Sequence, residues 1–216
     1  MPIIKNEDQD VTLECSGQAC RELEQILADQ DRDWYELFTA CLLYENQFKT
    51  KENNQDGEVT SERSFFNVTR LDLALDEHYS EEGNYALISL NRYLEAGEYT
   101  SRKKKYRAYL GGNMAHRRAD GVSLYIGSKQ SPLFFRFYEK DFERAEALGI
   151  SVEAIHELYG YKNRFEISIH KEISDRFVHD YVREEFDLGQ RGVEIINDNL
   201  TVYADDKQHL DADWFD

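Results

Sequence analysis

The stretch LFFRFYEKD, at residues 133–141, decides the fold that the sequence predicts. It is short and aromatic and follows a serine–proline turn signal at residues 131–132, which is typical of a β-strand. Because side chains alternate between the two faces of a strand, one face is apolar, and we expect it to enter the core. The apolar face comprises Leu133, Phe135 and Phe137. The other face places a tyrosine between two cations, namely Arg136, Tyr138 and Lys140.

This polar face has two interpretations. A tyrosine between two cations suits chemistry on a phosphate, because a phenol can act as a nucleophile and the cations offset the charge of the phosphate. The same pattern also fits a solvated sheet face with one amphipathic tyrosine. The strand alone leaves both interpretations open.

Two further stretches show the same alternation, at residues 66–76 and 163–170. The polar face of the first carries Asp72 and Asp76, although aspartate is a poor strand former. Two carboxylates on one face suit a hard divalent cation, whereas charges that protect an edge strand from aggregation are the alternative. The polar face of the second carries Arg164, Glu166 and His170.

We expect the three strands to belong to one sheet whose apolar side is covered by helices. The predicted fold is therefore α+β, with a curved, mainly antiparallel sheet and helices packed on one face. We expect residues 1–10 to be an acidic N-terminal extension and residues 11–186 to be the main domain. Residues 49–63 are expected to be a polar loop. Residues 187–216 are expected to be an acidic, weakly patterned C-terminal extension with one last strand near residues 200–203.

Composition narrows the class of protein. The chain has no apolar run near the roughly 18 residues needed to span a bilayer and no hydrophobic signal region, so we expect a cytoplasmic protein without a membrane partner. Its three cysteines have no zinc-site spacing. The sequence also lacks a P-loop, a GxGxxG motif and a supported serine–histidine pair.

Charge is distributed unevenly. The net charge of −17 argues against a general nucleic-acid coat, yet residues 102–140 hold ten basic and only two acidic residues. This basic tract is either a solvated loop or a path for a phosphate backbone. The candidate DNA contacts are Arg102, Lys103, Lys104, Lys105, Arg107, Arg117, Arg118, Lys129 and Arg164.

The three polar faces together suit transesterification at a phosphodiester. Asp72, Asp76 and Glu166 are candidate ligands for Mg²⁺ or Mn²⁺, which prefer oxygen donors. Tyr138 is the candidate nucleophile, and its two flanking cations, Arg136 and Lys140, are expected to favour the phenolate and to offset phosphate charge. Tyr125, on the preceding strand, competes with Tyr138 for the role of nucleophile.

Five segments in order resemble the replication initiation factor family, which includes rolling-circle initiators of plasmids and related relaxases of integrative conjugative elements. They are SGQACRELE at 16–24, TRLDLALD at 69–76, YIGSKQS at 125–131, FRFYEK at 135–140 and NRFEI at 163–167. The resemblance covers about residues 11–186, which it identifies as a replication-initiator-like catalytic domain.

The resemblance implies that Tyr138 nicks one DNA strand at an origin, stays joined to the 5′-phosphate and leaves a free 3′-OH for rolling-circle replication. It also implies Mg²⁺ or Mn²⁺ held by acids at Asp72, Asp76 and Glu166. The implied partners are single-stranded or hairpin origin DNA, a second copy of the chain and a host helicase. The alternative is a non-catalytic or truncated relative that dimerises with a full-length initiator as a regulator.

Overall fold

The computed structural model describes residues 3–7, 10–48, 50–53, 59–63, 66–113 and 118–203. The chain forms two compact units, the first made of residues 1–67 and 176–185 and the second of residues 68–175 and 186–216. The domain boundaries expected at residues 10 and 186 remain predictions. Among the helices in the described ranges, none is both long and apolar enough to cross a bilayer.

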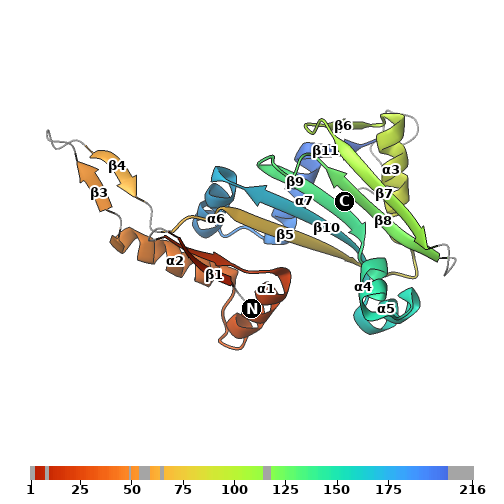
Figure 1. Ribbon diagram of the computed structural model, residues 1–216, viewed down its shortest axis with the longest axis horizontal. Helices are drawn as coiled ribbons and strands as arrows, with labels where there is room; N and C mark the ends of the chain where they lie inside the picture. The colour runs from red at the N-terminus through yellow and green to blue at the C-terminus, as the bar shows by residue number, and fades with distance from the viewer. Residues whose placement is uncertain are drawn as a thin grey trace. The chain divides into compact units, whose positions relative to one another are not determined.

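The second unit is built on a five-stranded antiparallel sheet with the strand order β5-β10-β9-β8-β7 (Figure 1). The strands are β5 (Arg70–His78), β7 (Tyr106–Asn113), β8 (Arg118–Ile126), β9 (Leu133–Glu139) and β10 (Tyr161–His170). The three strands expected to share a sheet do so, with β10 between β5 and β9. Ile167 of β10 lies opposite both Leu73 and Phe135, and all three side chains are buried. The predicted α+β fold is confirmed.

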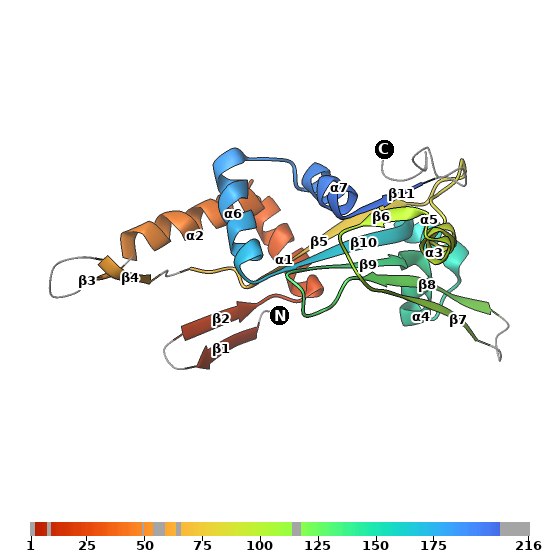
Figure 2. The ribbon, with the colours of Figure 1, turned by 90° about the horizontal axis from the view of Figure 1, so that it is seen from above.

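Helices cover the apolar face of this sheet. Helix α3 (Leu87–Ala96) contacts β8 and β9, and α7 (Leu188–Asn199) contacts β5. Both helices are seen beside a two-stranded ribbon of β6 (Tyr99–Ser101) and β11 (Leu200–Val202) in Figure 2. Leu87 and Leu90 of α3 and Ile196 of α7 are fully buried.

Helix α7 lies in the segment that the sequence analysis expected to be weakly patterned. Asp187 caps its N-terminus by accepting a hydrogen bond from the Gln190 backbone N–H at 2.7 Å. Gly192 allows close packing, because a Cβ at this position would lie 3.1 Å from Leu75 Cδ2 of β5. Glycine lowers helix propensity. The residue that allows α7 to pack closely against β5 therefore also weakens the helical signal in the sequence.

The strand β9 ends at Glu139, before the last two residues, Lys140 and Asp141, of the stretch that the sequence predicts as a strand. Lys140 begins helix α4 (Lys140–Leu148) rather than continuing the polar face of the strand. The acids Asp141 and Glu143 lie in the first turn of α4, where negative charge is favoured by the helix dipole. Gly149 ends α4 in the left-handed conformation, and Ser151 caps α5 (Val152–Tyr159).

The described residues of the first unit form two whole helices, two hairpins and, from residue 176 onward, most of a third helix. Its elements are β1 (Ile3–Glu7), β2 (Asp10–Glu14), α1 (Gly17–Ala28), α2 (Trp34–Phe48), β3 (Thr50–Asn53) and β4 (Val59–Arg63). The rings of Tyr35 and Phe38 in α2 pack edge-on against Tyr181 of α6 (Glu172–Glu184). The predicted loop at 49–63 is therefore wrong for its described residues, which form the β3–β4 hairpin. These short strands lack an apolar face in their sequence, which removes the usual strand signal.

We predict that Gly192→Leu destabilises the second unit by about 1–3 kcal/mol, because the new side chain must displace Leu75 in a packed core. Leucine is a good helix former, so the loss would report packing rather than helix propensity. Urea unfolding followed by circular dichroism measures the change. The matched control is Gly17→Leu, since a Cβ at Gly17 would meet nothing within 4 Å. Equal midpoints for Gly192→Leu and the parent protein would contradict the close packing.

Candidate active site

The polar faces of β5, β10 and β9 form one surface, because the register of the sheet sets their outward-facing residues directly opposite one another. In one row, Asp76 lies opposite Arg164, and Arg164 lies opposite Tyr138. In the next row, Glu166 lies opposite Arg136. The alternation of three separate stretches of sequence therefore brings the candidate nucleophile, carboxylates and arginines together.

Tyr138 is the centre of this surface and is held on several sides. Its hydroxyl donates a hydrogen bond to Glu166 Oε1 at 3.0 Å and accepts one from Lys140 Nζ at 3.3 Å. The Arg136 guanidinium lies over the tyrosine ring, 4.0 Å from its centroid. Only 3% of the Tyr138 surface is exposed. The orientation of the phenol is thus fixed by its neighbours.

The protonation of Tyr138 differs from the sequence-based expectation. Burial raises the pKa of Tyr138 well above its ordinary value, and the charges of Glu166 and Glu143 raise it further. The Arg164 charge opposes this shift without reversing it. In this arrangement, burial and the neighbouring acids favour the protonated phenol over the phenolate. A base must remove the proton, and Glu166 is within hydrogen-bonding distance of it.

Lys140 reaches the tyrosine from the start of α4 instead of from the strand. Its Nζ lies between the Tyr138 hydroxyl and Glu143 Oε2, with the latter contact at 2.7 Å. Burial lowers the pKa of Lys140, and the hydrogen bond to Glu143 opposes that shift. The residue therefore places a buried ammonium beside the phenol despite the error in the predicted end of the strand.

The three candidate metal ligands do not converge. Within the described ranges, no group of three or more His, Cys, Asp or Glu side chains is arranged to hold a metal ion. Asp76 is bound through both oxygens by Arg164, and these hydrogen bonds raise the pKa of Arg164. Asp72 pairs with Arg70 in an exposed contact whose shorter N···O distance is 2.6 Å.

Two of these carboxylates, Asp72 and Glu166, are neighbours on one face of the sheet. Glu166 lies opposite Ala74 and Asp72 lies two residues from Ala74 along β5, so the two acids are diagonal neighbours on one face. Magnesium is commonly bound by one or two carboxylates together with water and substrate phosphates. Asp72 and Glu166 are the pair that such a site would use, and binding an ion would require Asp72 to leave Arg70, which holds both of its oxygens as Arg164 holds both oxygens of Asp76.

The candidate DNA-binding cations divide into separate groups. Arg107 is exposed and lies opposite Tyr125 on the polar face, and the Lys129 ammonium lies 5.6 Å from the centroid of the Tyr125 ring. Lys103 instead donates to the Leu133 carbonyl and lies over the Phe135 ring, and burial lowers its pKa. The segment before β7 also exposes Arg102, Lys104 and Lys105.

Two of the predicted cations cannot be placed as side chains. Arg117 lies outside the described residues. Arg118 begins β8, opposite Asn113.

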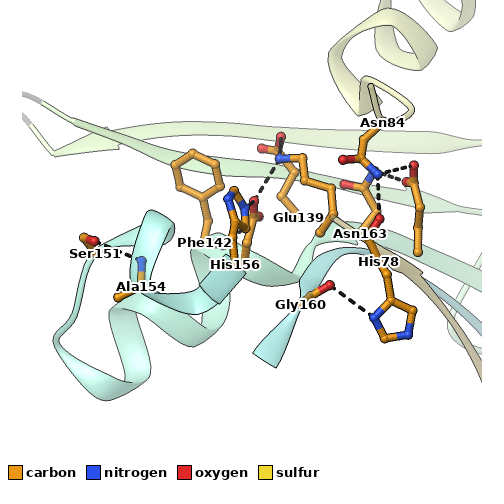
Figure 3. Close-up of polar contacts among 12 residues, drawn as sticks. His78, Asn84, Glu139, Phe142, Ser151, Ala154, His156, Gly160 and Asn163 are labelled. Carbon is orange, nitrogen blue, oxygen red and sulfur yellow. Dashed lines mark hydrogen bonds and ion pairs between the residues drawn. The ribbon is translucent and has the colours of Figure 1, made fainter. Parts of the chain in front are cut away.

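A buried network that the sequence analysis missed anchors the junction between β9 and α4. Asp141 is completely buried, and its Oδ2 contacts His156 Nε2 at 2.8 Å and accepts a hydrogen bond from Lys162 Nζ at 2.9 Å. Lys162 also donates to Glu139 at 3.3 Å, and Glu139 accepts from the Val122 backbone N–H. Figure 3 shows the side chains of Glu139 and of His156, which belongs to α5, at this junction. The network fixes the short segment that carries both Tyr138 and Lys140.

A second group of polar contacts secures the far end of β5 and β10. Asn163 donates from Nδ2 to Glu77 and to the Tyr85 carbonyl, and Asn84 donates to the other oxygen of Glu77. His78 contacts the Gly160 carbonyl, as Figure 3 also shows. These contacts lock the strand ends next to the Asp76–Arg164 row.

Comparison with known proteins gives a consistent result. The chain matches the family described as replication initiation factor over residues 66–215. Residues 2–40 match the N-terminal domain of rolling circle replication initiation proteins.

A curated relative from Bacillus subtilis (strain 168), named as a candidate DNA relaxase NicK, is 26% identical over 205 residues. That alignment covers 95% of this chain and 50% of the relative, so the chain spans about half the length of that protein.

A solved structure has the same fold. It is the rolling circle replication initiator protein from Geobacillus stearothermophilus, with a TM-score of 0.67 and 24% sequence identity. The superposition covers 96% of this chain and 68% of the solved chain. The family match, which spans most of the residues of this chain, shows that the chain belongs to the replication initiation factor family.

Proposed function

We propose that this chain cleaves and rejoins one DNA strand at a replication or transfer origin by transesterification through Tyr138. The single observation that carries the proposal is the position of the Tyr138 hydroxyl between a carboxylate and an ammonium, with Arg136 on its ring. The relatives named as a relaxase and as a rolling circle initiator support the same class of reaction.

The groups around Tyr138 suit two proton transfers, one away from the phenol and one to the departing oxygen. Glu166 accepts the phenolic proton while the tyrosine oxygen attacks the scissile phosphorus. The bond from phosphorus to the 3′ oxygen breaks, which leaves a 5′-phosphotyrosine. Lys140 is placed to give a proton to the departing oxygen, which becomes the free 3′-OH. The reverse sequence rejoins the strand.

Arginine supplies charge compensation for the phosphate. The Arg136 side chain contacts Glu166 at 3.4 Å and also interacts with Tyr125, and within the described residues its buried Nε has no hydrogen-bond partner. Its donors are therefore incompletely used by the protein. A guanidinium with unused donors can bind phosphate oxygens in the planar, two-pronged manner that arginine favours.

A divalent ion is part of the proposal. Asp72 and Glu166 would hold Mg²⁺ or Mn²⁺, and the bound ion would polarise a phosphate oxygen. The proposed partners are origin DNA in single-stranded or hairpin form, a second copy of this chain and a host helicase.

A second candidate function is regulatory, and the net charge of −17 favours it. A non-catalytic relative would pair with a full-length initiator without cutting DNA. A supercoiled plasmid that carries the DNA around the coding sequence, incubated with the protein and Mn²⁺, distinguishes the two functions. The nickase produces an open circular form with protein attached to its 5′ end, whereas the regulator leaves the plasmid intact.

We predict that Tyr138→Phe abolishes nicking and the covalent adduct while DNA binding stays within about twofold of the parent, because only one hydroxyl is lost. The control is Tyr125→Phe, which removes a hydroxyl from the neighbouring strand β8 and should still cut. Mass spectrometry of a trapped adduct identifies the modified residue. A nucleotide on Tyr125, or full activity in Tyr138→Phe, would overturn the assignment.

We predict that Glu166→Gln slows cleavage by about 10²–10⁴-fold, the usual contribution of a positioned base. If Glu166 removes the phenolic proton, the residual rate should rise with pH, because hydroxide must take over that step. Asp72→Asn tests the metal separately, since excess Mn²⁺ should restore its activity without changing the pH profile. Rescue of Glu166→Gln by Mn²⁺ alone, with no change in pH dependence, would show that Glu166 is only a ligand.

We predict that Arg107→Gln weakens DNA binding and reduces the slope of log K against log salt by about one unit, because one phosphate contact is lost. Lys103→Gln is the matched control, since its ammonium is bound to the Leu133 carbonyl and should not contribute to the slope. Fluorescence anisotropy at several salt concentrations measures both slopes. Identical slopes for Arg107→Gln and the parent would mean that Arg107 is only solvated.

A further inference from the structure

We propose that the β7–β8 side of the polar face binds the bases of single-stranded DNA beside the scissile phosphate, with Tyr109 as the stacking group and Tyr125 as the ring that supports it. This inference rests on the proposed nicking function and adds the surface that would position the substrate. It gives a role to Tyr109, an exposed aromatic residue that the reaction itself does not use.

The sheet register places these tyrosines next to the site. Tyr109 lies opposite Ser123, and Ser123 lies opposite Tyr138, so the three residues form one row across β7, β8 and β9. Neighbouring strands are about 4.8 Å apart, which puts Tyr109 roughly 10 Å from the nucleophile along the sheet. Tyr125 lies in the adjacent row, opposite Arg136.

The two rings form a partly exposed aromatic platform. Their centroids are 5.4 Å apart with an interplanar angle of 80°, so one ring meets the edge of the other. Tyr125 also stacks on the buried Phe134, at 6.1 Å and 27°, which fixes its orientation. Tyr109 is 58% exposed although it lies within a strand. One ring is therefore held in place, and the other presents its surface to a ligand.

Cations surround the platform. Arg107 lies directly opposite Tyr125, and the Lys129 ammonium and the Arg136 guanidinium lie 5.6 and 5.9 Å from the Tyr125 centroid. Among the described residues, neither Arg107 nor Lys129 forms an ion pair with a carboxylate. Aromatic rings interleaved with cations match single-stranded nucleic acid, whose bases stack on rings while its phosphates bind cations. Duplex DNA hides its base faces, so this surface should prefer a single strand.

The test measures binding in the full chain carrying Tyr138→Phe, without divalent ions, so that no cleavage intervenes. A fluorescently labelled single-stranded oligo(dT) and an abasic oligonucleotide of the same length are the probes. Tyr109→Leu should weaken oligo(dT) binding about 5- to 150-fold, the range expected for the loss of one stacked base. Tyr109→Phe, which keeps the ring, should bind like its parent. The control is Tyr159→Leu, at an exposed tyrosine of α5, and it should have no effect.

The abasic probe isolates stacking from charge. It should bind the parent and Tyr109→Leu equally, because it has phosphates but no bases. Equal oligo(dT) affinity in Tyr109→Leu and its parent would overturn the inference, as would an equal loss for both probes. Light scattering tests whether the exposed ring instead serves contact between copies of the chain. A change of oligomeric state in Tyr109→Leu without a base-dependent loss of binding would also refute it.

The outcome is separable from that of the proposed function. If the chain nicks DNA through Tyr138 but Tyr109→Leu leaves oligo(dT) binding unchanged, only the proposed stacking surface is refuted. If the parent does not bind single-stranded DNA and the unmodified chain does not nick, both the stacking surface and the proposed nicking function are refuted.

Discussion

The pairing of β10 with β5 on one side and β9 on the other is the constraint on which the rest of the site depends. A shift of one residue in either register would turn every polar side chain of that strand toward the core. The row of Leu73, Ile167 and Phe135 opposes such a shift, because all three side chains are buried on the apolar face. Burial of hydrocarbon on one face thereby sets the distance between Glu166 and Tyr138 on the other.

Buried charged side chains in the second unit hold the junction of β9 and α4 in place. A fully buried carboxylate is costly unless its oxygens are satisfied, and Asp141 meets that requirement through Lys162, His156 and the Phe142 backbone N–H. Removal of one partner would leave a buried charge uncompensated. The network therefore ties α5 and β10 to Glu139 and Asp141, the two residues that flank Lys140, so the position of the Tyr138 phenol depends on contacts made outside its own surroundings.

Most of the sequence prediction was based on the alternation of side chains along strands. The prediction failed where the structure depends on contacts with residues far away in the sequence. The period of two in β5, β9 and β10 sufficed to place Asp72, Tyr138 and Glu166 on one surface. It could not show that Lys140 begins a helix, because the partners that hold that helix start lie 15 and 21 residues beyond Asp141. Nor could it show that Asp76 binds Arg164, since a pattern gives the face of a residue but not its ion-pair partner. Burial, which raises the pKa of Tyr138, is likewise a property of the packed sheet.

The arrangement of charge on the polar face explains how an acidic chain can still have a surface for phosphate. Arginines pair with the acids of the face, Arg70 with Asp72, Arg164 with Asp76 and Arg136 with Glu166, so the face does not present a row of bare carboxylates. The least complete pair is Arg136–Glu166, at 3.4 Å, and it adjoins Tyr138. In the proposed reaction, a phosphate that binds Arg136 would compete with Glu166 for the same donors, and Glu166 would keep its hydrogen bond to the phenolic proton. The reaction proposed for Tyr138 would therefore couple the binding of a phosphate to the release of Glu166 from this one ion pair.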